Sequence, residues 1–176
     1  MSSVLSKKEI KKLLRHKPPL VEGLIQPEEQ LQPNGVDLTL RDIAMLQSAG
    51  RIAISISQRT VSALSPLVFD GLGFIQLMPG IYSVTYNEIV NIPKSLMALA
   101  TPRSSLLRCG VTVNTAVWDA GYCGRSESLL VVYNPLGFHL QKNARIIQLV
   151  FFRLDNETDG YQGRYQGENI EHKPSG

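Results

Sequence analysis

The residues best suited to chemistry form a short run near the middle of the chain, Pro102-Arg103-Ser104-Ser105-Leu106-Leu107-Arg108. Two hydroxyls at the start of an expected helical turn, flanked by arginines, match the donors that phosphate oxygens need. Free helix amides and hydroxyls donate hydrogen bonds, and guanidinium adds a charged, forked donor. The same pattern is also typical of a capping serine beside solvated arginines. The run therefore indicates either a phosphate site or an ordinary capped turn.

A second candidate lies in the glycine-flanked turn Trp118-Asp119-Ala120-Gly121-Tyr122-Cys123-Gly124. Asp119 could orient or deprotonate a water molecule, which requires an acceptor within hydrogen-bond reach of that water. Tyr122 offers a flat face to a sugar or a base. A turn aspartate commonly bonds its own backbone instead, so both interpretations stay open.

Three polar positions in expected strands are more ambiguous. Asp37 follows a turn and could face solvent or approach a hydrated metal ion. Regular alternation from Arg145 would place Arg145 and Ile147 on one face and Gln148 on the other. Gln148 is then a polar residue among buried neighbours and needs a hydrogen-bond partner.

Several familiar catalytic patterns are missing. The three histidines, His16, His139 and His172, are too scattered for a histidine metal site, and no HxE…CxxC pattern of a zinc deaminase is present. GxSxG, Walker A and GxGxxG sequences are also absent, which excludes hydrolase-fold, P-loop and Rossmann chemistry. We therefore do not expect a zinc-dependent nucleobase deaminase.

One segment has the pattern of a helix. Ser6 and Glu9 have the spacing of a capping box, and Ile10, Leu13 and Leu14 form an apolar stripe. Pro18-Pro19 prevents the helix from continuing far beyond His16. We expect a short N-terminal helix, followed later by one helical turn at Ser104 or Ser105.

Most of the remaining chain has the period of two that is typical of strands. The expected strands are Val36–Leu40, Ile52–Ser57, Gly73–Leu77, Ile81–Tyr86, Leu96–Thr101, Val111–Val113, Leu129–Tyr133, Phe138–Leu140 and Ile146–Leu154. Many short strands separated by glycine, proline and asparagine turns favour a mostly β fold, either a sandwich, a jelly roll or a distorted barrel.

Composition bounds the class of protein. The 176 residues suit one domain, and 18 Lys plus Arg against 15 Asp plus Glu give a net charge of +3, weak evidence for a polyanionic partner. The basic run from Lys7 to Arg15 is expected to be the solvated face of the helix. No apolar stretch is long enough to span a membrane, and the first five residues lack the apolar core and cleavage site expected of a signal peptide. We expect a cytoplasmic protein with two reduced, buried thiols, Cys109 and Cys123, and with no nucleic-acid polymer or membrane as partner.

The C-terminal stretch is polar and glycine-rich and cannot make a core strand. We place the β domain with its helix at residues 1–154 and a flexible arm at residues 155–176. The segment Tyr161-Gln-Gly-Arg-Tyr-Gln-Gly167 mixes aromatics, an arginine and glycines, so it could be a disordered tail or could close over a ligand.

The order of five segments resembles the superfamily of dUTP diphosphatases and dCTP deaminases, especially the archaeal-type dUTP diphosphatases. The segments are Gln30–Leu38, Arg103–Gly110, Asp119–Gly124, Arg145–Val150 and Tyr161–Gly167. The resemblance runs from Leu5 to Gly167. It implies a distorted jelly-roll barrel that assembles as a homotrimer with active sites shared between chains, and an arm that covers a neighbour's site.

The resemblance also implies a reaction, the hydrolysis of dUTP to dUMP and pyrophosphate. Asp119 would activate the attacking water, and Mg²⁺ would be held mainly by the substrate phosphates, with Asp37 acting through water at most. Tyr122 would pack beneath the deoxyribose, and backbone groups near Val111–Thr115 would read the uracil with Tyr161. Arg108 is implied to be the second catalytic residue beside Asp119, bracing the site. The residues implied to hold the triphosphate are Arg103, Ser104, Ser105, Gln148, Arg164 and Gln166.

Two positions depart from the pattern of this superfamily. The deaminases carry a glutamate that shuttles protons at the base, and the corresponding position here is Leu129, or Val131 in a second alignment. The nearest acid, Glu127, fits neither alignment. Val36 stands where the family often has tyrosine. We therefore expect a dUTP diphosphatase. The alternatives are a dCTP deaminase or bifunctional enzyme that uses Glu127 through a bulged strand, and a non-catalytic nucleotide-binding trimer.

Overall fold

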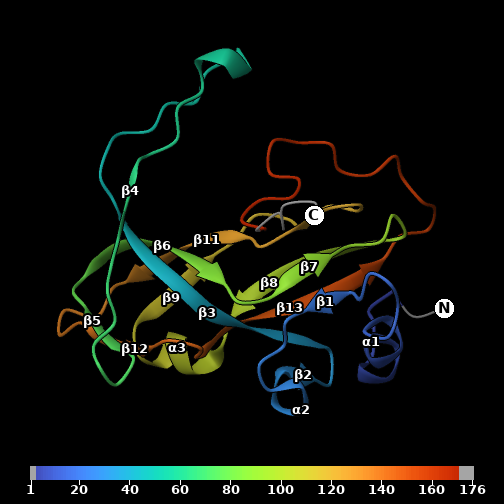
Figure 1. The fold of residues 1–176 in the computed structure, drawn as a ribbon, viewed down its shortest axis with the longest axis horizontal. Helices are drawn as coiled ribbons and strands as arrows, with labels where there is room; N and C mark the ends of the chain where they lie inside the picture. Colours follow the sequence, from blue (N-terminus) through green and yellow to red (C-terminus); the bar gives the residue numbers. More distant parts are fainter. Residues whose placement is uncertain (1–2, 171–176) are drawn as a thin grey trace, which may run out of the picture.

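The computed structural model describes residues 3–170, and its architecture is dominated by antiparallel strands (Figure 1). The helical segments are α1 (Lys7–Leu13), α2 (Pro27–Gln30), α3 (Ser104–Arg108) and the 3₁₀ turn η1 (Ile56–Gln58). The strands are β1 (Val21–Glu22), β2 (Leu31–Gln32), β3 (Gly35–Leu46), β4 (Leu64–Pro66), β5 (Phe74–Leu77), β6 (Gly80–Tyr86), β7 (Ile89–Asn91), β8 (Leu96–Pro102), β9 (Val111–Asn114), β10 (Cys123–Gly124), β11 (Glu127–Val132), β12 (Phe138–Gln141) and β13 (Arg145–Arg153). The prediction of a mostly β fold with a short N-terminal helix is confirmed.

The N-terminal helix forms as its sequence predicts. The Glu9 carboxylate accepts hydrogen bonds from the Ser6 backbone amide and from the Ser6 hydroxyl, both at 2.9 Å. Ile10 is fully buried on the inner face of the helix. Arg153 at the end of β13 donates to Glu9 at 2.6 Å, so a charged pair ties α1 to the main sheet.

The main sheet is a nearly closed barrel. Its strands run in the order β8-β13-β3-β6-β11-β9, and β2 and β4 add to β3. The two end strands, β8 and β9, lie in contact with each other, and α3 connects them along the chain. Two smaller sheets, β1-β7-β10 and β12-β5, complete the structure. All the strand pairs are antiparallel.

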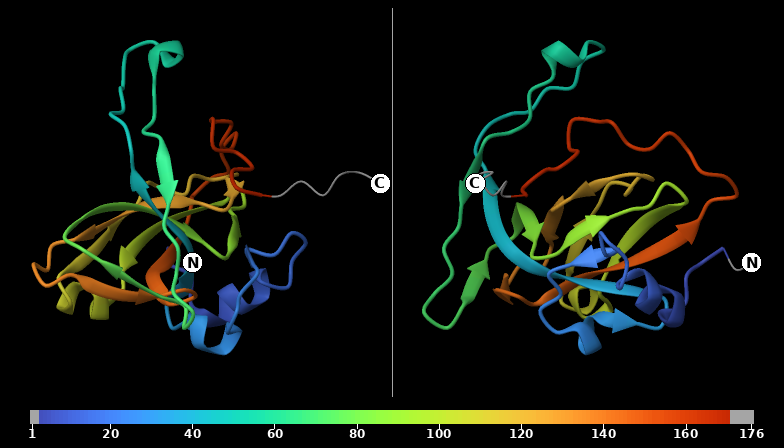
Figure 2. Two further views of the ribbon diagram at one scale, coloured as in Figure 1. Left: turned by 60° about the vertical axis from the view of Figure 1, so that its left-hand side comes forward. Right: turned by 45° about the vertical axis from the view of Figure 1, so that its right-hand side comes forward.

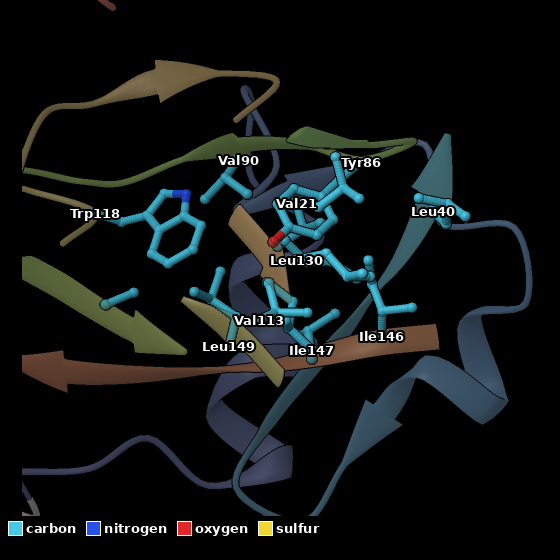
Figure 3. Close-up of a cluster of buried hydrophobic side chains, with 14 of the residues drawn as sticks. Val21, Leu40, Tyr86, Val90, Val113, Trp118, Leu130, Ile146, Ile147 and Leu149 are labelled. Carbon is cyan, nitrogen blue, oxygen red and sulfur yellow. The ribbon is translucent and has the colours of Figure 1, made fainter. Parts of the chain in front are cut away.

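Large apolar side chains fill the space enclosed by the sheets (Figure 3). They come from both the barrel and the smaller β1-β7-β10 sheet, so one core joins the two. The labelled members of this cluster are Val21, Leu40, Tyr86, Val90, Val113, Trp118, Leu130, Ile146, Ile147 and Leu149. Burying side chains of this size stabilises a fold by roughly 1.5–3 kcal/mol each relative to exposure.

Two register shifts interrupt the regular alternation of the long strands. One falls between Leu40 and Asp42, where β3 pairs with β6. The other falls between Arg145 and Ile147, where β13 pairs with β3. As a result Ile146 and Ile147 are both fully buried, and the predicted regular alternation from Arg145 to Gln148 is wrong at this point. A bulge places an extra residue in one strand, which changes the phase of the side chains beyond it.

One predicted strand is absent from the structure. Ile52–Ser57 belongs to a long connection between β3 and β4 that stands away from the body of the molecule (Figure 2). In this segment Ile52, Ile54 and Ile56 are 81%, 108% and 77% exposed. The alternating isoleucines have high strand propensity, but within residues 3–170 they pair with no strand, and only the preceding residue, Arg51, forms an isolated bridge, with Thr60. The segment bends into η1 instead.

Two further expectations concern the cysteines and the membrane. Both cysteines are free, but Cys109 is exposed and Cys123 half-buried, so the expectation of buried thiols is wrong. Cys109 follows α3, a short helix that buries only Leu106 and leaves its other side chains outside the core. Within residues 3–170, the helices are too short or too polar to cross a bilayer.

Candidate active site

The predicted phosphate-binding run lies where β8 turns into α3. Arg103 is the N-cap residue in extended conformation, and its amide donates to the Ile146 carbonyl at 3.0 Å, which anchors the turn to β13. Ser104 and Ser105 are exposed in the first turn of α3, while Leu106 is buried and holds the helix against the barrel. The two hydroxyls are therefore available to a ligand from outside.

A buried carboxylate orients the arginine of this run. Asp37 on β3 is buried, with 1% of its side chain exposed, and its Oδ2 accepts a hydrogen bond from Arg103 Nη1 at 2.6 Å. Arg145 Nη1 lies 3.6 Å from the same oxygen, and Gln32 Nε2 donates to it at 3.1 Å. Burial raises the pKa of the Asp37 carboxyl, and the two arginines oppose that rise. The other oxygen, Oδ1, has no hydrogen-bond partner in the described part of the chain.

Asp37 therefore occupies neither of the places that the sequence suggested for it, since it is shielded from solvent and paired with arginines. Behind it lies a second buried carboxylate. Gln30 Nε2 donates to the Asp37 carbonyl at 2.9 Å and to Glu88 Oε1 at 2.6 Å. Glu88 also accepts hydrogen bonds from the Thr39 amide at 2.9 Å and the Thr39 hydroxyl at 2.6 Å. This network fixes the backbone of β3 beneath Asp37.

Gln148 lies beside this cluster. On β13 it is paired with Asp37 of β3 on one side and with Thr101 of β8 on the other. Its side chain is half-buried and makes no hydrogen bond within residues 3–170, so the predicted need for a partner is not met inside the chain. The structure thus brings Arg103, Arg145 and Gln148 together next to the exposed serines of α3. Arg108, at the other end of α3, is exposed.

The predicted water-activating turn lies on a different part of the barrel. Trp118 forms a two-bond bridge with Ala98 of β8, at 2.9 and 3.0 Å. The next residue, Asp119, is exposed, and its carboxylate makes no hydrogen bond within the described residues. Its carbonyl accepts from the Tyr122 amide at 3.1 Å, which closes the turn. Gly121 has a φ of 82°, a conformation that a side chain would strain.

A pocket of about 220 Å³ opens beside this turn. Tyr122 forms part of its wall and is itself buried, with 6% of its surface exposed. The pocket is lined by Ala116, Val117, Trp118, Asp119, Tyr122, Ser126, Glu127, Tyr161, Tyr165 and Glu168. Its volume is below the roughly 300–1,000 Å³ of typical small-molecule sites. Three of its lining residues, Tyr161, Tyr165 and Glu168, come from the C-terminal arm.

The arm packs on the Tyr122 turn of its own chain. The Tyr161 amide donates to the Ala120 carbonyl at 2.7 Å, and the Tyr161 ring meets the Tyr122 ring edge-on with centroids 5.8 Å apart. The Gln166 side chain accepts from the Cys123 amide and donates to the Gly121 carbonyl, both at 3.0 Å. Arg164 is exposed and makes no hydrogen bond or ion pair within the described residues. Residues 171–176 of the predicted arm lie outside the described residues.

The two halves of the predicted site are separated within one chain. Trp118 is bridged to Ala98, whereas Arg103 lies five residues further along the same extended segment. At about 3.3 Å per residue this places Arg103 and α3 roughly 15–20 Å from the Asp119 turn. The residues that line the 220 Å³ pocket include none from α3 or β13. The predicted phosphate-binding and water-activating groups therefore do not line one common pocket within residues 3–170.

The position expected for a deaminase proton shuttle carries no carboxylate. Leu129 is half-buried on β11, and Val131 is buried. Glu127, at the start of the same strand, lines the pocket of the Tyr122 turn, and its carboxylate accepts from Asn169 Nδ2 at 3.3 Å. An acidic group thus faces the pocket, two residues before the expected shuttle position.

The side chains do not form a cage for a metal ion. Within residues 3–170 there is no group of three or more histidine, cysteine, aspartate or glutamate side chains that could hold one. Asp37 is already paired with Arg103 and Arg145, which leaves it poorly suited to a hydrated cation. The donors present fit an ion that is held through substrate phosphates and reached by single carboxylates.

Sequence patterns missed two functional candidates, Ser126 and Glu168. The Tyr122 hydroxyl donates to Glu168 Oε1 at 2.7 Å and lies 3.0 Å from Ser126 Oγ, which also accepts from Trp118 Nε1 at 2.6 Å. Glu168 stands 46 positions after Tyr122, so no local spacing signals the contact. The Asp37–Arg103 pair, 66 positions apart, was missed for the same reason.

Comparison with known proteins gives consistent matches. A family model described as "dCTP deaminase-like" matches residues 4–154. A protein of Methanosarcina mazei named "Probable deoxyuridine 5'-triphosphate nucleotidohydrolase" is 55% identical over 168 residues, which covers 95% of this chain and 98% of that protein. A protein of the same name from Archaeoglobus fulgidus is 47% identical over 169 residues, covering 96% of this chain and 99% of the relative.

A solved structure supports the fold. The 2'-deoxycytidine 5'-triphosphate deaminase of Agrobacterium tumefaciens matches with a TM-score of 0.64 and 18% sequence identity. The match covers 86% of this chain and 49% of the deaminase, so this chain spans about half the length of that enzyme. At this identity the likeness concerns the fold alone, and it agrees with the jelly-roll barrel expected from the sequence.

Proposed function

The chain belongs to the dCTP deaminase-like family, and we propose that within this family it is an enzyme that hydrolyses dUTP to dUMP and pyrophosphate. Relatives that are 47–55% identical over nearly the whole chain carry the name of this activity. The structural observation that favours hydrolysis over deamination is Leu129. The strand position expected to hold a proton-shuttling glutamate is apolar, while Asp119 is exposed at the pocket.

Asp119 is the group we assign to water activation. Its carboxylate is exposed and unpaired within the described residues, so it is free to accept a proton from a water molecule in the pocket. The water oxygen would form a bond to the α-phosphorus, and the bond from that phosphorus to the oxygen bridging to the β-phosphate would break. The proton passes to Asp119, and pyrophosphate leaves.

The α3 cluster is the group we assign to the triphosphate. Ser104 and Ser105 offer hydroxyls, and Gln148 has an amide without a partner inside the described chain. Arg103 is held in place by Asp37, so its guanidinium loses little conformational freedom when it binds phosphate. We assign Arg108, which is exposed at the end of α3, to the same region.

The separation of these groups supports a shared site. Because Asp119 and Arg103 lie roughly 15–20 Å apart in one chain, we propose that the α3 cluster of one chain meets the Asp119 turn of another. A head-to-tail contact of this kind closes into a ring when the rotation permits, and we propose a homotrimer. A cytoplasmic location remains a prediction of the sequence.

Magnesium fits this arrangement as a substrate-bound ion. Held by the phosphate oxygens, Mg²⁺ would offset the negative charge that develops on the leaving pyrophosphate. The chain's contribution is to place Ser104, Ser105 and Arg103 around the phosphates and to present Asp119 to the water. No direct protein ligand is required by this scheme.

The nucleoside is assigned to the pocket beside Tyr122. We propose that the Tyr122 ring packs beneath the deoxyribose, and that Tyr161 and backbone groups of Val111–Thr115 contact the uracil. The Gln166 side chain is hydrogen-bonded to the Tyr122 turn in this structure. To bind the triphosphate it must break these two hydrogen bonds and form new ones with phosphate oxygens. Arg164 is exposed, and its side chain makes no hydrogen bond or ion pair within residues 3–170 that phosphate binding would have to break.

One assay separates the candidate functions. The purified protein is incubated with Mg²⁺ and with dUTP, dCTP or dTTP, and released pyrophosphate and nucleotide bases are quantified. Pyrophosphate from dUTP without any base conversion supports the proposal. Uracil nucleotides formed from dCTP would favour a deaminase or bifunctional enzyme that uses Glu127, which faces the pocket. Binding of dUTP without turnover would favour a non-catalytic nucleotide-binding protein.

A further inference from the structure

A one-way chain of hydrogen bonds runs from the core to the C-terminal arm. Trp118 Nε1 donates to Ser126 Oγ at 2.6 Å, and an indole nitrogen can only donate. At the other end, an ionised Glu168 carboxylate can only accept, so the Tyr122 hydroxyl donates its proton to Glu168 Oε1 at 2.7 Å. The Ser126 hydroxyl is therefore left to donate to the Tyr122 oxygen, 3.0 Å away.

Most of the side chains in this series of hydrogen bonds are shielded from water. Trp118, Tyr122 and Ser126 are 4%, 6% and 6% exposed. Burial, together with the nearby negative charge of Glu127, raises the pKa of Glu168, and burial also raises that of Tyr122. A buried hydroxyl that loses its partner carries a desolvation penalty, so each bond in the chain favours the others.

The backbone near these side chains leaves room for the hydrogen bonds and holds Glu168 in place. Gly124 lies so close to the Tyr122 hydroxyl that a Cβ at this position would collide with it. Glu168 is also fixed through its backbone, because its carbonyl accepts from the Arg125 amide at 2.9 Å, next to a 2.8 Å bond from the Gly167 amide to the Cys123 carbonyl. The Glu168 carboxylate therefore stands over the Tyr122 hydroxyl only when the arm is packed on the turn.

We propose that Glu168 is a positioning residue for dUTP hydrolysis, which fixes the Tyr122 ring for the deoxyribose and couples the position of that ring to closure of the arm. The inference rests on the proposed function for the role of the Tyr122 ring. The coupling between Glu168, Tyr122 and the arm rests on the hydrogen bonds alone. The two parts can therefore be tested separately.

The coupling is tested first, on the protein without nucleotide. Arg164 is an exposed trypsin site within the arm, and Trp118, the single tryptophan of the chain, reports on the pocket by fluorescence. Glu168→Ala should speed cleavage after Arg164 by about tenfold and shift the Trp118 emission, since one charged-group hydrogen bond is lost. Glu168→Gln keeps an acceptor oxygen and should stay within about threefold of the unaltered protein. Glu157→Ala, an exposed arm glutamate, is the matched control and should change neither signal.

The positioning role is tested by steady-state kinetics with dUTP and UTP. Glu168→Ala should raise KM for dUTP about tenfold and change kcat less than threefold, because the ring platform is loosened while Asp119 is untouched. The preference for dUTP over UTP, which differ by the 2'-hydroxyl, should fall with it. Glu168→Gln should restore both values to within about threefold of the unaltered enzyme.

Each outcome decides between the parts of the proposal. Unchanged cleavage and fluorescence in Glu168→Ala would overturn the coupling. Altered cleavage with an unchanged KM and an unchanged preference for dUTP would overturn the positioning role. A Glu168→Gln variant as impaired as Glu168→Ala would overturn the assignment of Glu168 as a hydrogen-bond acceptor. If the unaltered protein released no pyrophosphate from dUTP, the proposed function and the positioning role would both fail, whereas the cleavage result would still decide the coupling.

Discussion

Replacing Asp37 by asparagine tests the charge cluster beneath α3. The substitution preserves the shape of the side chain and removes its negative charge. In the structure Asp37 Oδ2 lies 2.6 Å from Arg103 Nη1 and 3.6 Å from Arg145 Nη1, with 1% of the Asp37 side chain exposed. Asp37→Asn therefore leaves two arginines facing each other without the carboxylate between them.

The expected loss in the free energy of unfolding depends on how deeply Asp37 and the two arginines are buried. Removing one partner of a buried ion pair costs about 3–5 kcal/mol in the free energy of unfolding. The arginine side chains are 29% and 28% exposed, so water can solvate them in part and reduce this loss. Asp37 Oδ1 already lacks a partner, so the native carboxylate is itself incompletely satisfied. We expect Asp37→Asn to lower the free energy of unfolding by about 2–3 kcal/mol, which corresponds to a urea midpoint lower by about 1 M.

The assay is urea unfolding at equal protein concentrations, because any association of chains also contributes to stability. Asp42→Asn is a matched control on the same strand, since Asp42 pairs with Arg41 at 3.2 Å but its side chain is 59% exposed. An exposed pair contributes about 0–1 kcal/mol. If Asp37→Asn lowered the free energy of unfolding no more than Asp42→Asn does, the Asp37 cluster would not stabilise the fold and the reasoning would be refuted.

Three further predictions concern the turn, the arm and the buried carboxylates. Asp119→Asn should lower kcat for dUTP by about 10²–10⁴-fold and leave the free energy of unfolding within about 0.5 kcal/mol, since the side chain is exposed; a variant that keeps most of its rate would contradict the role of Asp119 as the base. Gly121→Ala should loosen the arm and speed trypsin cleavage after Arg164, because a Cβ would lie 2.8 Å from Gly160 Cα; unchanged cleavage would contradict this packing. Burial raises the pKa of Glu88 above its ordinary 4.5, so the folded chain takes up this proton at a higher pH than the unfolded chain does. The free energy of unfolding should therefore gain a contribution as pH falls towards 4.5, and urea titrations should show a smaller gain in Glu88→Gln.

Features that depend on neighbouring residues could be predicted from the sequence. The capping box of Ser6 and Glu9 is a contact between residues three apart, and the structure contains it. The helical turn at Ser104 and the alternating strand at Ile81–Tyr86 also carry their signals locally. Ile52–Ser57 shows the limit of such signals, because alternation reports the propensity of a segment and does not show whether a partner strand lies beside it.

The residues of the candidate site also fall into those that local sequence could predict and those that it could not. The serines of α3 and the Asp119 turn are short linear motifs and could be found without a structure. Their partners could not, because Asp37 reaches Arg103 across 66 positions and Glu168 reaches Tyr122 across 46. Contacts of this kind depend on how strands pair across the barrel, which local spacing does not encode.

The two bulges have a consequence for how this chain tolerates changes in length. Because side chains alternate with a period of two, losing one residue reverses which side chains face inward along the rest of a strand. In β3 the shift lies between Leu40 and Asp42, and in β13 between Arg145 and Ile147. A deletion of Arg41, the extra residue of the first bulge, would leave Leu40 opposite Tyr86 and Asp42 opposite Thr85, so the inner and outer residues of β3 would keep their faces. A deletion of the same size in the projecting connection between β3 and β4 would leave every paired strand in phase. Single-residue deletions that preserve the fold should therefore gather in that connection and at the bulges, and avoid the regularly paired parts of the strands.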